Sequence, residues 1–263
     1  MSDSRNVVNT GFVGFDKLTG GLRGGDLVCL ASRPGTGKSS LALNIAFNVA
    51  TAERPKAVLI FSLELTAIQV AARLYALKTG TPSWRDADDS WPAASSALND
   101  VPFYIVDKGG LGVKDMAVVG RKMKDEPRRR EPVGMVIVDY FQLVGGPGGW
   151  AGDRAGEMRL IAQGLKALAR ELDAPILVVS QLARRAPKNG EPESPRVDDL
   201  REAHAIVECA DVVALLHRPG NGRPNMPLGE REEAELLVVK NKRGPRGVVR
   251  LDFFKDSLRF RER

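Results

Sequence analysis

The chain has 263 residues, 43% of them hydrophobic, and a formal net charge of +6, values typical of an ordinary folded protein. No apolar run reaches the roughly 20 residues that a membrane-spanning helix needs, and the first residues form no signal peptide. Cys29 and Cys209 are too few for a disulfide framework or a metal cluster, so we expect two buried free thiols in a reducing cytoplasm.

The basic residues are unevenly distributed. Six lie between Arg121 and Arg130, and five lie between Lys240 and Arg250, the second group without an acidic residue. Such an excess suits a polyanionic partner such as nucleic acid, but a solvated charged face explains one basic cluster equally well. Charge alone therefore leaves both interpretations open.

Along the chain, residues 1–9 are expected to be flexible, and residues 9–25 form a glycine-rich lead-in segment. Short apolar runs rich in β-branched residues predict strands over 26–31, 57–62, 103–106, 135–139, 176–180, 212–216, 236–239 and 248–254. Apolar residues at helical spacing predict helices over 40–50, 67–78, 113–124 and 154–172. Thr66 and Gln69 form a capping box for the second of these helices. Residues 79–100 predict a loop with one short helix, in which Trp84 is expected to be a packing anchor.

Strands that alternate with helices, each strand a near-continuous apolar run, predict an α/β fold with a mostly parallel sheet covered by helices on both faces. The last strands have no helices between them, so the sheet is expected to end in a C-terminal antiparallel hairpin that turns at Gly244-Pro245. No repeat, heptad or linker is visible. The sequence therefore predicts a single domain over residues 1–263.

Residues 32–39, Ser-Arg-Pro-Gly-Thr-Gly-Lys-Ser, lie between a predicted strand and a predicted helix. Gly35 and Gly37 can adopt backbone angles closed to other residues, so successive N–H groups can point into one concavity. The start of the following helix adds its own unpaired N–H groups and the positive end of its dipole. This arrangement predicts a phosphate-binding loop of the P-loop type.

In such a loop, Lys38 can reach the β- and γ-phosphates of a nucleotide, and the Ser39 hydroxyl can bind Mg²⁺. The candidate nucleotide-binding residues are Arg33, Pro34, Gly35, Thr36, Gly37, Lys38, Ser39 and Ser40. The full P-loop pattern has glycine at its first position, where this chain has Ser32.

Three polar residues follow predicted strands at their carboxyl ends, where ligands collect in open α/β sheets. Asp139 occupies the position from which an aspartate holds Mg²⁺ or its water in P-loop NTPases. Glu64 can polarise an attacking water, and Gln181 can sense the γ-phosphate. Each has an ordinary explanation, because a chain that leaves a sheet needs polar residues. Together with Lys38 and Ser39, however, they would all converge on one phosphate site.

Further motifs lie in a specific order over residues 10–260: Thr10-Gly11-Phe12, Leu18-Thr19-Gly20-Gly21-Leu22, Phe61-Ser62-Leu63-Glu64, Val138-Asp139-Tyr140-Phe141-Gln142-Leu143, Ser180-Gln181-Leu182, Asp199-Leu200-Arg201-Glu202 and Ala210-Asp211-Val212-Val213. In order and spacing the chain resembles the C-terminal motor domain of DnaB-type replicative DNA helicases. That family tolerates a small residue other than glycine at position 32.

The resemblance implies a RecA-like P-loop NTPase fold, a homo-hexameric ring, and ATP-driven 5′-to-3′ movement along single-stranded DNA during replication in the cytoplasm. It makes Glu64 the catalytic base, Asp139 the Mg²⁺-site acid and Gln181 the γ-phosphate sensor. ATP and Mg²⁺ are the implied cofactors, and a primase or a helicase loader is an implied further partner.

The resemblance also assigns residues 199–209 to a DNA-binding loop, with Arg201 and Glu202 at the contacting positions. His204 stands near a glycine of the family pattern, so it either hinders the approach of a phosphate or donates a hydrogen bond to it. The arginine finger of the family lies in Lys-x-Arg-Asn-Gly-Pro, and this chain has Lys240-Asn241-Lys242-Arg243-Gly244-Pro245. Position favours Lys242 and guanidinium chemistry favours Arg243, with Lys240 acting beside either.

Two differences from the family keep an alternative open. Members carry a separate N-terminal helicase domain, whereas this sequence begins at the motor domain, as a short natural form or a diverged relative would. A lysine at the finger position would also slow hydrolysis. The alternative is a RecA-like DNA-binding ATPase that acts as a recombination or assembly scaffold.

Overall fold

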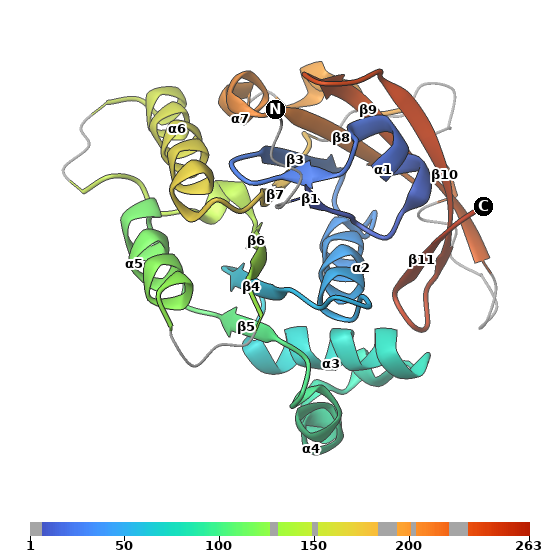
Figure 1. Ribbon diagram of the computed structural model, residues 1–263. Coiled ribbons are helices and arrows are strands. Elements are labelled where there is room, and N and C mark those ends of the chain that lie inside the picture. Colours follow the sequence, from blue (N-terminus) through green and yellow to red (C-terminus); the bar gives the residue numbers. More distant parts are fainter. Residues whose placement is uncertain (1–6, 127–130, 149–151, 184–193, 201–203, 221–230) are drawn as a thin grey trace.

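The computed structural model describes residues 7–126, 131–148, 152–183, 194–200, 204–220 and 231–263 (Figure 1). Its centre is a nine-stranded sheet with the strand order β11-β10-β9-β8-β3-β7-β6-β4-β5. The strands are β3 (Leu27–Ser32), β4 (Ala57–Ser62), β5 (Phe103–Val106), β6 (Val133–Asp139), β7 (Ile176–Gln181), β8 (Val212–His217), β9 (Arg231–Asn241), β10 (Gly247–Phe254) and β11 (Arg259–Glu262).

The sheet is parallel from β8 through β3, β7, β6 and β4 to β5, and antiparallel from β8 through β9 and β10 to β11. The predicted α/β fold and the antiparallel C-terminal hairpin are therefore confirmed. The structure adds β11 at the edge and lengthens β9 well beyond the predicted 236–239. Residues of β9 alternate between exposed and buried, so a search for continuous apolar runs detects only its end.

Helices cover both faces of the sheet (Figure 1). They are α1 (Val13–Thr19), α2 (Lys38–Ala50), α3 (Ala67–Thr79), α4 (Ala87–Leu98), α5 (Val113–Lys124), α6 (Arg154–Leu172) and α7 (His204–Cys209). Two hydrophobic cores result, one with α2 and α3 and the other with α5, α6 and α7. Successive residues of β3 alternate between them: Val28 and Leu30 enter the first core, and Cys29 enters the second.

The N-terminal segment contains more structure than expected. Val7–Val8 (β1) pairs with Leu22–Arg23 (β2), so the end of segment 1–9 is a paired strand, and α1 lies within the glycine-rich lead-in. The predicted capping box of α3 is present, with Thr66 accepting the Gln69 N–H and Gln69 accepting the Thr66 N–H.

Residues 79–100 form the short 3₁₀ helix η2 (Ser83–Arg85) and the regular helix α4, so the prediction of a loop with one short helix was wrong there. Two features hid this helix. Pro92 lies inside it, and its inward-facing positions are mostly alanine, with Ala94 buried, so its helical apolar pattern is weak. No helix of the described residues is long and apolar enough to cross a bilayer.

Burial raises the pKa of the Cys29 thiol to about 12, so the expectation of an inert buried thiol is confirmed at this position. Cys209 at the end of α7 is only half-buried, which corrects the expectation that both thiols are buried.

Candidate active site

The loop between β3 and α2 has the backbone that phosphate binding requires. Gly35 and Gly37 have positive φ angles of 73° and 98°, and Gly37 is the residue from which α2 begins. A Cβ atom on Gly37 would lie 3.2 Å from Phe260 Cζ, so both the angle and the space favour glycine. Ser32 is the buried last residue of β3, and its Oγ donates to the Arg33 carbonyl at 2.9 Å. Its φ is not positive, so the position does not require the glycine of the full pattern.

A cavity of about 610 Å³ opens beside this loop. The loop, the end of β4, α3, η2 and the end of β10 line it. Its charged residues are Lys38, Glu64, Arg73, Arg218, Glu232 and Lys255. Because four of these six side chains are cations, the cavity suits a polyanion such as a polyphosphate.

Asp139 is buried at the carboxyl end of β6, with 9% of its surface exposed. One of its oxygens, Oδ1, has no hydrogen-bond partner within the described part of the chain, while the carboxylate accepts a hydrogen bond from Ser39. Burial raises the pKa of Asp139, and the Ser39 hydrogen bond and the charges of Lys38 and Arg73 oppose this shift. A buried carboxylate with an unused oxygen beside a hydroxyl fits a hard divalent cation such as Mg²⁺.

Glu64 is exposed at the mouth of the cavity, just beyond the end of β4. Arg73 of α3 lies within electrostatic range of both Glu64 and Asp139, and burial lowers its pKa while these carboxylates oppose the shift. The sequence analysis missed Arg73. A signal was present, because Arg73 shares one helix face with the buried residues Val70, Leu74 and Leu77, where an arginine needs a polar partner.

Gln181 ends β7 beside Ser32, its register partner on β3. The side chain of Gln142 holds this strand end: Nε2 donates to the Gln181 carbonyl at 3.0 Å, and Oε1 accepts the Gln181 N–H at 3.3 Å. Gln142 belonged to a recognised motif, but its role as a clamp becomes visible only once β6 and β7 lie side by side. Gln181 is thereby fixed at the carboxyl end of β7, next to the strand whose carboxyl end holds Asp139.

The opposite wall of the cavity contains an ion pair that the sequence analysis did not detect. Arg218 follows β8, and its Nη2 lies 2.5 Å from Glu232 Oε2 at the start of β9. Arg218 Nη1 also donates to the Thr36 carbonyl at 3.1 Å, and its guanidinium stacks 4.2 Å from the centroid of Phe253. Residues 221–230 separate the partners in sequence, so no local pattern linked them.

Trp84 of η2 is an anchor, as expected, but it also lines the cavity. Its Nε1 donates to the Asp256 carbonyl at 2.8 Å, and the neighbouring Arg85 pairs with the Asp256 carboxylate at 2.8 Å. Both contacts join η2 to the turn between β10 and β11. Segments 171 residues apart thus meet at this end of the cavity.

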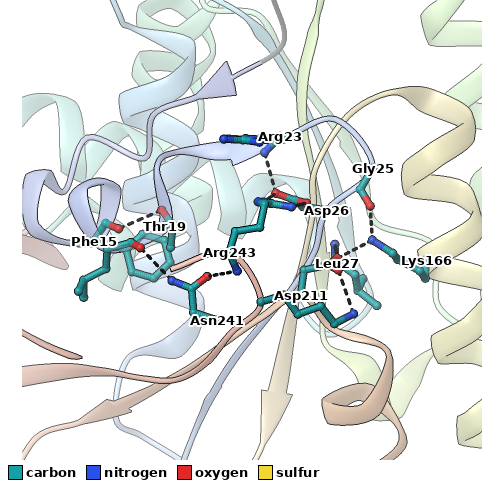
Figure 2. A network of polar contacts seen from close by, with 12 residues as sticks. Phe15, Thr19, Arg23, Gly25, Asp26, Leu27, Lys166, Asp211, Asn241 and Arg243 are labelled. Atoms are coloured by element: carbon teal, nitrogen blue, oxygen red, sulfur yellow. Dashed lines mark hydrogen bonds and ion pairs between the residues drawn. The ribbon is translucent and has the colours of Figure 1, made fainter. Parts of the chain in front are cut away.

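The candidate finger residues lie around the amino ends of β3 and β8, where Figure 2 shows Arg243. Lys242 pairs with Asp211 at 3.0 Å, and Arg243 pairs with Asp26. Lys240 Nζ donates to the carbonyls of Val207 and Glu208 at the end of α7, at 2.6 and 3.1 Å. A six-residue strand spans about 20 Å, so these cations are far from the phosphate loop of their own chain.

The candidate DNA-binding residues are only partly described. Arg201 and Glu202 lie outside the described residues. His204 begins α7 and is exposed, with its Nδ1 3.6 Å from Glu208 Oε1 one turn later. The structure therefore leaves both expectations for His204 open.

Comparisons with known proteins show the family of the chain. The family described as "DnaB-like helicase C terminal domain" matches residues 7–262. Over 96% of this chain, 35% of residues are identical to the replicative DNA helicase DnaB of Geobacillus stearothermophilus, and 33% to the replicative DNA helicase DnaC of Bacillus subtilis. The matched region is 56% of each of these relatives, so the chain spans about half of their length.

Among solved structures, an isolated ATPase domain is similar with a TM-score of 0.79 and 27% identity, over 98% of this chain and 93% of that one. A second similar structure is described as that of a DnaB-like replicative helicase and its interactions with primase. It has a TM-score of 0.81 and 26% identity, over 96% of this chain and 61% of that one. The chain therefore belongs to the DnaB-like helicase C-terminal domain family, as the resemblance predicted.

Proposed function

We propose that the chain is an ATP-hydrolysing motor that moves 5′ to 3′ along single-stranded DNA as part of a replicative helicase. The observation that carries this proposal is that Lys38, Ser39 and Glu64 line one cavity beside a loop of the phosphate-binding type, while Asp139 accepts a hydrogen bond from Ser39. The part of the proposal that concerns DNA rests on the similar proteins, which are named replicative DNA helicases.

In this proposal the glycine loop and Lys38 bind the β- and γ-phosphates, and Ser39 with Asp139 holds Mg²⁺. The metal, when bound, neutralises phosphate charge. Glu64 accepts a proton from the attacking water. Arg73 is a positioning residue in this scheme, since its charge lies within electrostatic range of the carboxylates of Glu64 and Asp139 and opposes the rise in the pKa of Asp139. Gln181, fixed by Gln142, is the proposed γ-phosphate sensor.

The proposed assembly is a homo-hexameric ring of head-to-tail subunits. Lys242 and Arg243 lie near the amino ends of the parallel strands β3 and β8, and the phosphate loop lies at the carboxyl end of β3. One chain therefore cannot bring both to one phosphate. Head-to-tail packing apposes unlike surfaces of two copies, which allows a cation of one subunit to complete the site of the next. Arg201 and Glu202 are proposed to contact the DNA in the channel, and a primase or a loader is a proposed partner. The proposed location is the cytoplasm.

The alternative, an ATP-dependent scaffold with slow hydrolysis, lacks a specific observation in its favour. A forked DNA duplex with a 5′ single-stranded tail separates the two, because a translocating motor unwinds it in the presence of ATP and Mg²⁺. Unwinding that requires ATP and is lost in Lys38→Ala supports the proposal. Assembly on DNA with ATP, but no strand separation, would support the scaffold instead.

We expect Trp84 to contact the base of the nucleotide. With the phosphates at Lys38 and Ser39, the apolar side chains that line the cavity are Leu65, Trp84, Phe253 and Leu258. Stacking of a base on an aromatic ring contributes roughly 1–3 kcal/mol, so Trp84→Ala should weaken ATP binding about tenfold. Inorganic tripolyphosphate, which has no base, should bind the variant as it binds the parent.

Titration calorimetry with both ligands measures this difference. Trp91→Ala is a matched control, because Trp91 of α4 is 40% exposed and does not line the cavity. An equal loss of affinity for ATP and for tripolyphosphate would show that Trp84 shapes the loop rather than contacting the base.

A further inference from the structure

Two buried carboxylates hold the turn between β9 and β10 against the amino end of β3 (Figure 2). Asp26 and Asp211 are 3% and 7% exposed. Arg243 binds Asp26 with both terminal nitrogens, Nη1 to Oδ1 at 2.7 Å and Nη2 to Oδ2. Lys242 Nζ binds Asp211 Oδ1 at 3.0 Å. The two cations of the turn therefore have different carboxylate partners.

The two carboxylates differ in the number of cations around them. Asp211 is bound by Lys242 and also by Lys166 of α6, whose Nζ lies 2.5 Å from Oδ2, and the same Oδ2 accepts the Leu27 N–H at 2.9 Å. Asp26 accepts the Arg23 N–H, but among the described residues its ion-pair partner is Arg243.

This difference decides which cation can leave. If Lys242 moves away, Asp211 remains paired with Lys166 and hydrogen-bonded to Leu27. If Arg243 moves away, Asp26 is left buried without a counter-charge, which is strongly unfavourable. Lys166 itself stays in place, because its Nζ also donates to the Gly25 carbonyl at 2.5 Å (Figure 2).

The exposure and the hydrogen bonds of the turn also favour the release of Lys242 rather than Arg243. The Lys242 side chain is 45% exposed and reaches Asp211 through a flexible stem, whereas Arg243 uses a rigid bidentate fork. Asn241 fixes the backbone beside Arg243, since its side chain accepts the Arg243 N–H and donates to the carbonyls of Leu18 and Pro245.

We propose that Arg243 is a positioning residue that fixes the turn, and that Lys242 is the cation that leaves Asp211 to reach the phosphate of the neighbouring subunit. Lys166 keeps Asp211 paired during this movement, so Lys166 and Asp211 together set how easily Lys242 is released. The inference rests on the proposed function, because it presumes a nucleotide site completed by a second copy of the chain.

Lys166→Met tests the role of Lys166. In this variant the release of Lys242 leaves Asp211 buried and unpaired, so kcat of DNA-stimulated ATP hydrolysis should fall about tenfold with KM for ATP unchanged. Adding Asp211→Asn removes the charge that retains Lys242, while its amide oxygen still accepts the Leu27 N–H. The double variant should therefore recover most of the parent kcat. If the double variant is as slow as Lys166→Met, the holding role of Asp211 is wrong.

Mixed assemblies test the division between the two cations. Lys242→Met should keep the parent melting temperature, lose ATPase activity, and regain part of it when mixed with Lys38→Ala subunits. Arg243→Lys, which keeps a charge for Asp26, should keep its turnover and lower the melting temperature. Loss of turnover in Arg243→Lys that recovers on mixing, together with an active Lys242→Met, would overturn the assignment. An active Lys38→Ala chain would instead overturn the proposed function itself.

Discussion

Glu64→Gln is expected to lower kcat for ATP hydrolysis by about 10²–10⁴-fold while ATP binding is retained, because general-base catalysis contributes about this much. Glutamine has nearly the shape of glutamate but cannot accept the proton of the attacking water. Glu64 is exposed and is not among the residues proposed to bind the phosphates, whereas Lys38 is buried, so the substitution is expected to leave binding intact. Steady-state phosphate release and titration calorimetry with ATP measure the two effects separately.

Two further variants serve as the negative reference and the matched control for this measurement. Lys38→Ala should lose ATP binding as well as hydrolysis, because Lys38 is the buried cation at the start of α2. Glu53→Gln is the matched control, since Glu53 is an exposed glutamate after α2 that does not line the cavity. A Glu64→Gln variant with the parent kcat would remove Glu64 from the role of base, and Asp139 would become the next candidate.

Binding to single-stranded DNA is expected to weaken by roughly two to three orders of magnitude between about 50 and 200 mM salt, as for a protein that contacts about six phosphates of a single strand. A motor that moves along any strand must bind the phosphate backbone and not the bases, so homopolymers and mixed sequences should give similar affinities. Fluorescence anisotropy with labelled oligonucleotides over a salt series measures both properties.

Arg201→Ala should reduce the slope of log affinity against log salt by about 0.7, the value for one phosphate of a single strand. Arg121→Ala is the matched control, because Arg121 of α5 is an exposed arginine already paired with Glu171. An affinity that is independent of salt, or a preference for one short sequence, would contradict a translocating motor.

The sequence by itself determined the architecture and the position and backbone character of the candidate phosphate-binding loop. Both depend on short-range patterns: continuous apolar runs for the parallel strands, the 3.6-residue period for α2 and α6, and glycines where the loop before α2 has positive φ angles. Glu64, Asp139 and Gln181 could be proposed as site residues because parallel strands bring their carboxyl ends to one side of the sheet, which follows from the fold class alone.

The tertiary structure alone decided which distant side chains meet. Arg73 becomes part of the site only when α3 packs beside α2, and the Arg218–Glu232 pair joins the end of β8 to the start of β9. It also gave Lys242 and Arg243 different carboxylate partners, which no local rule could do, because those partners depend on the elements packed against the turn. Those carboxylates, Asp26 and Asp211, lie far apart in the chain and are brought together by the pairing of β3 with β8. Sequence patterns record which residues a strand or helix buries, whereas the partner of a buried charge is set by how those elements pack.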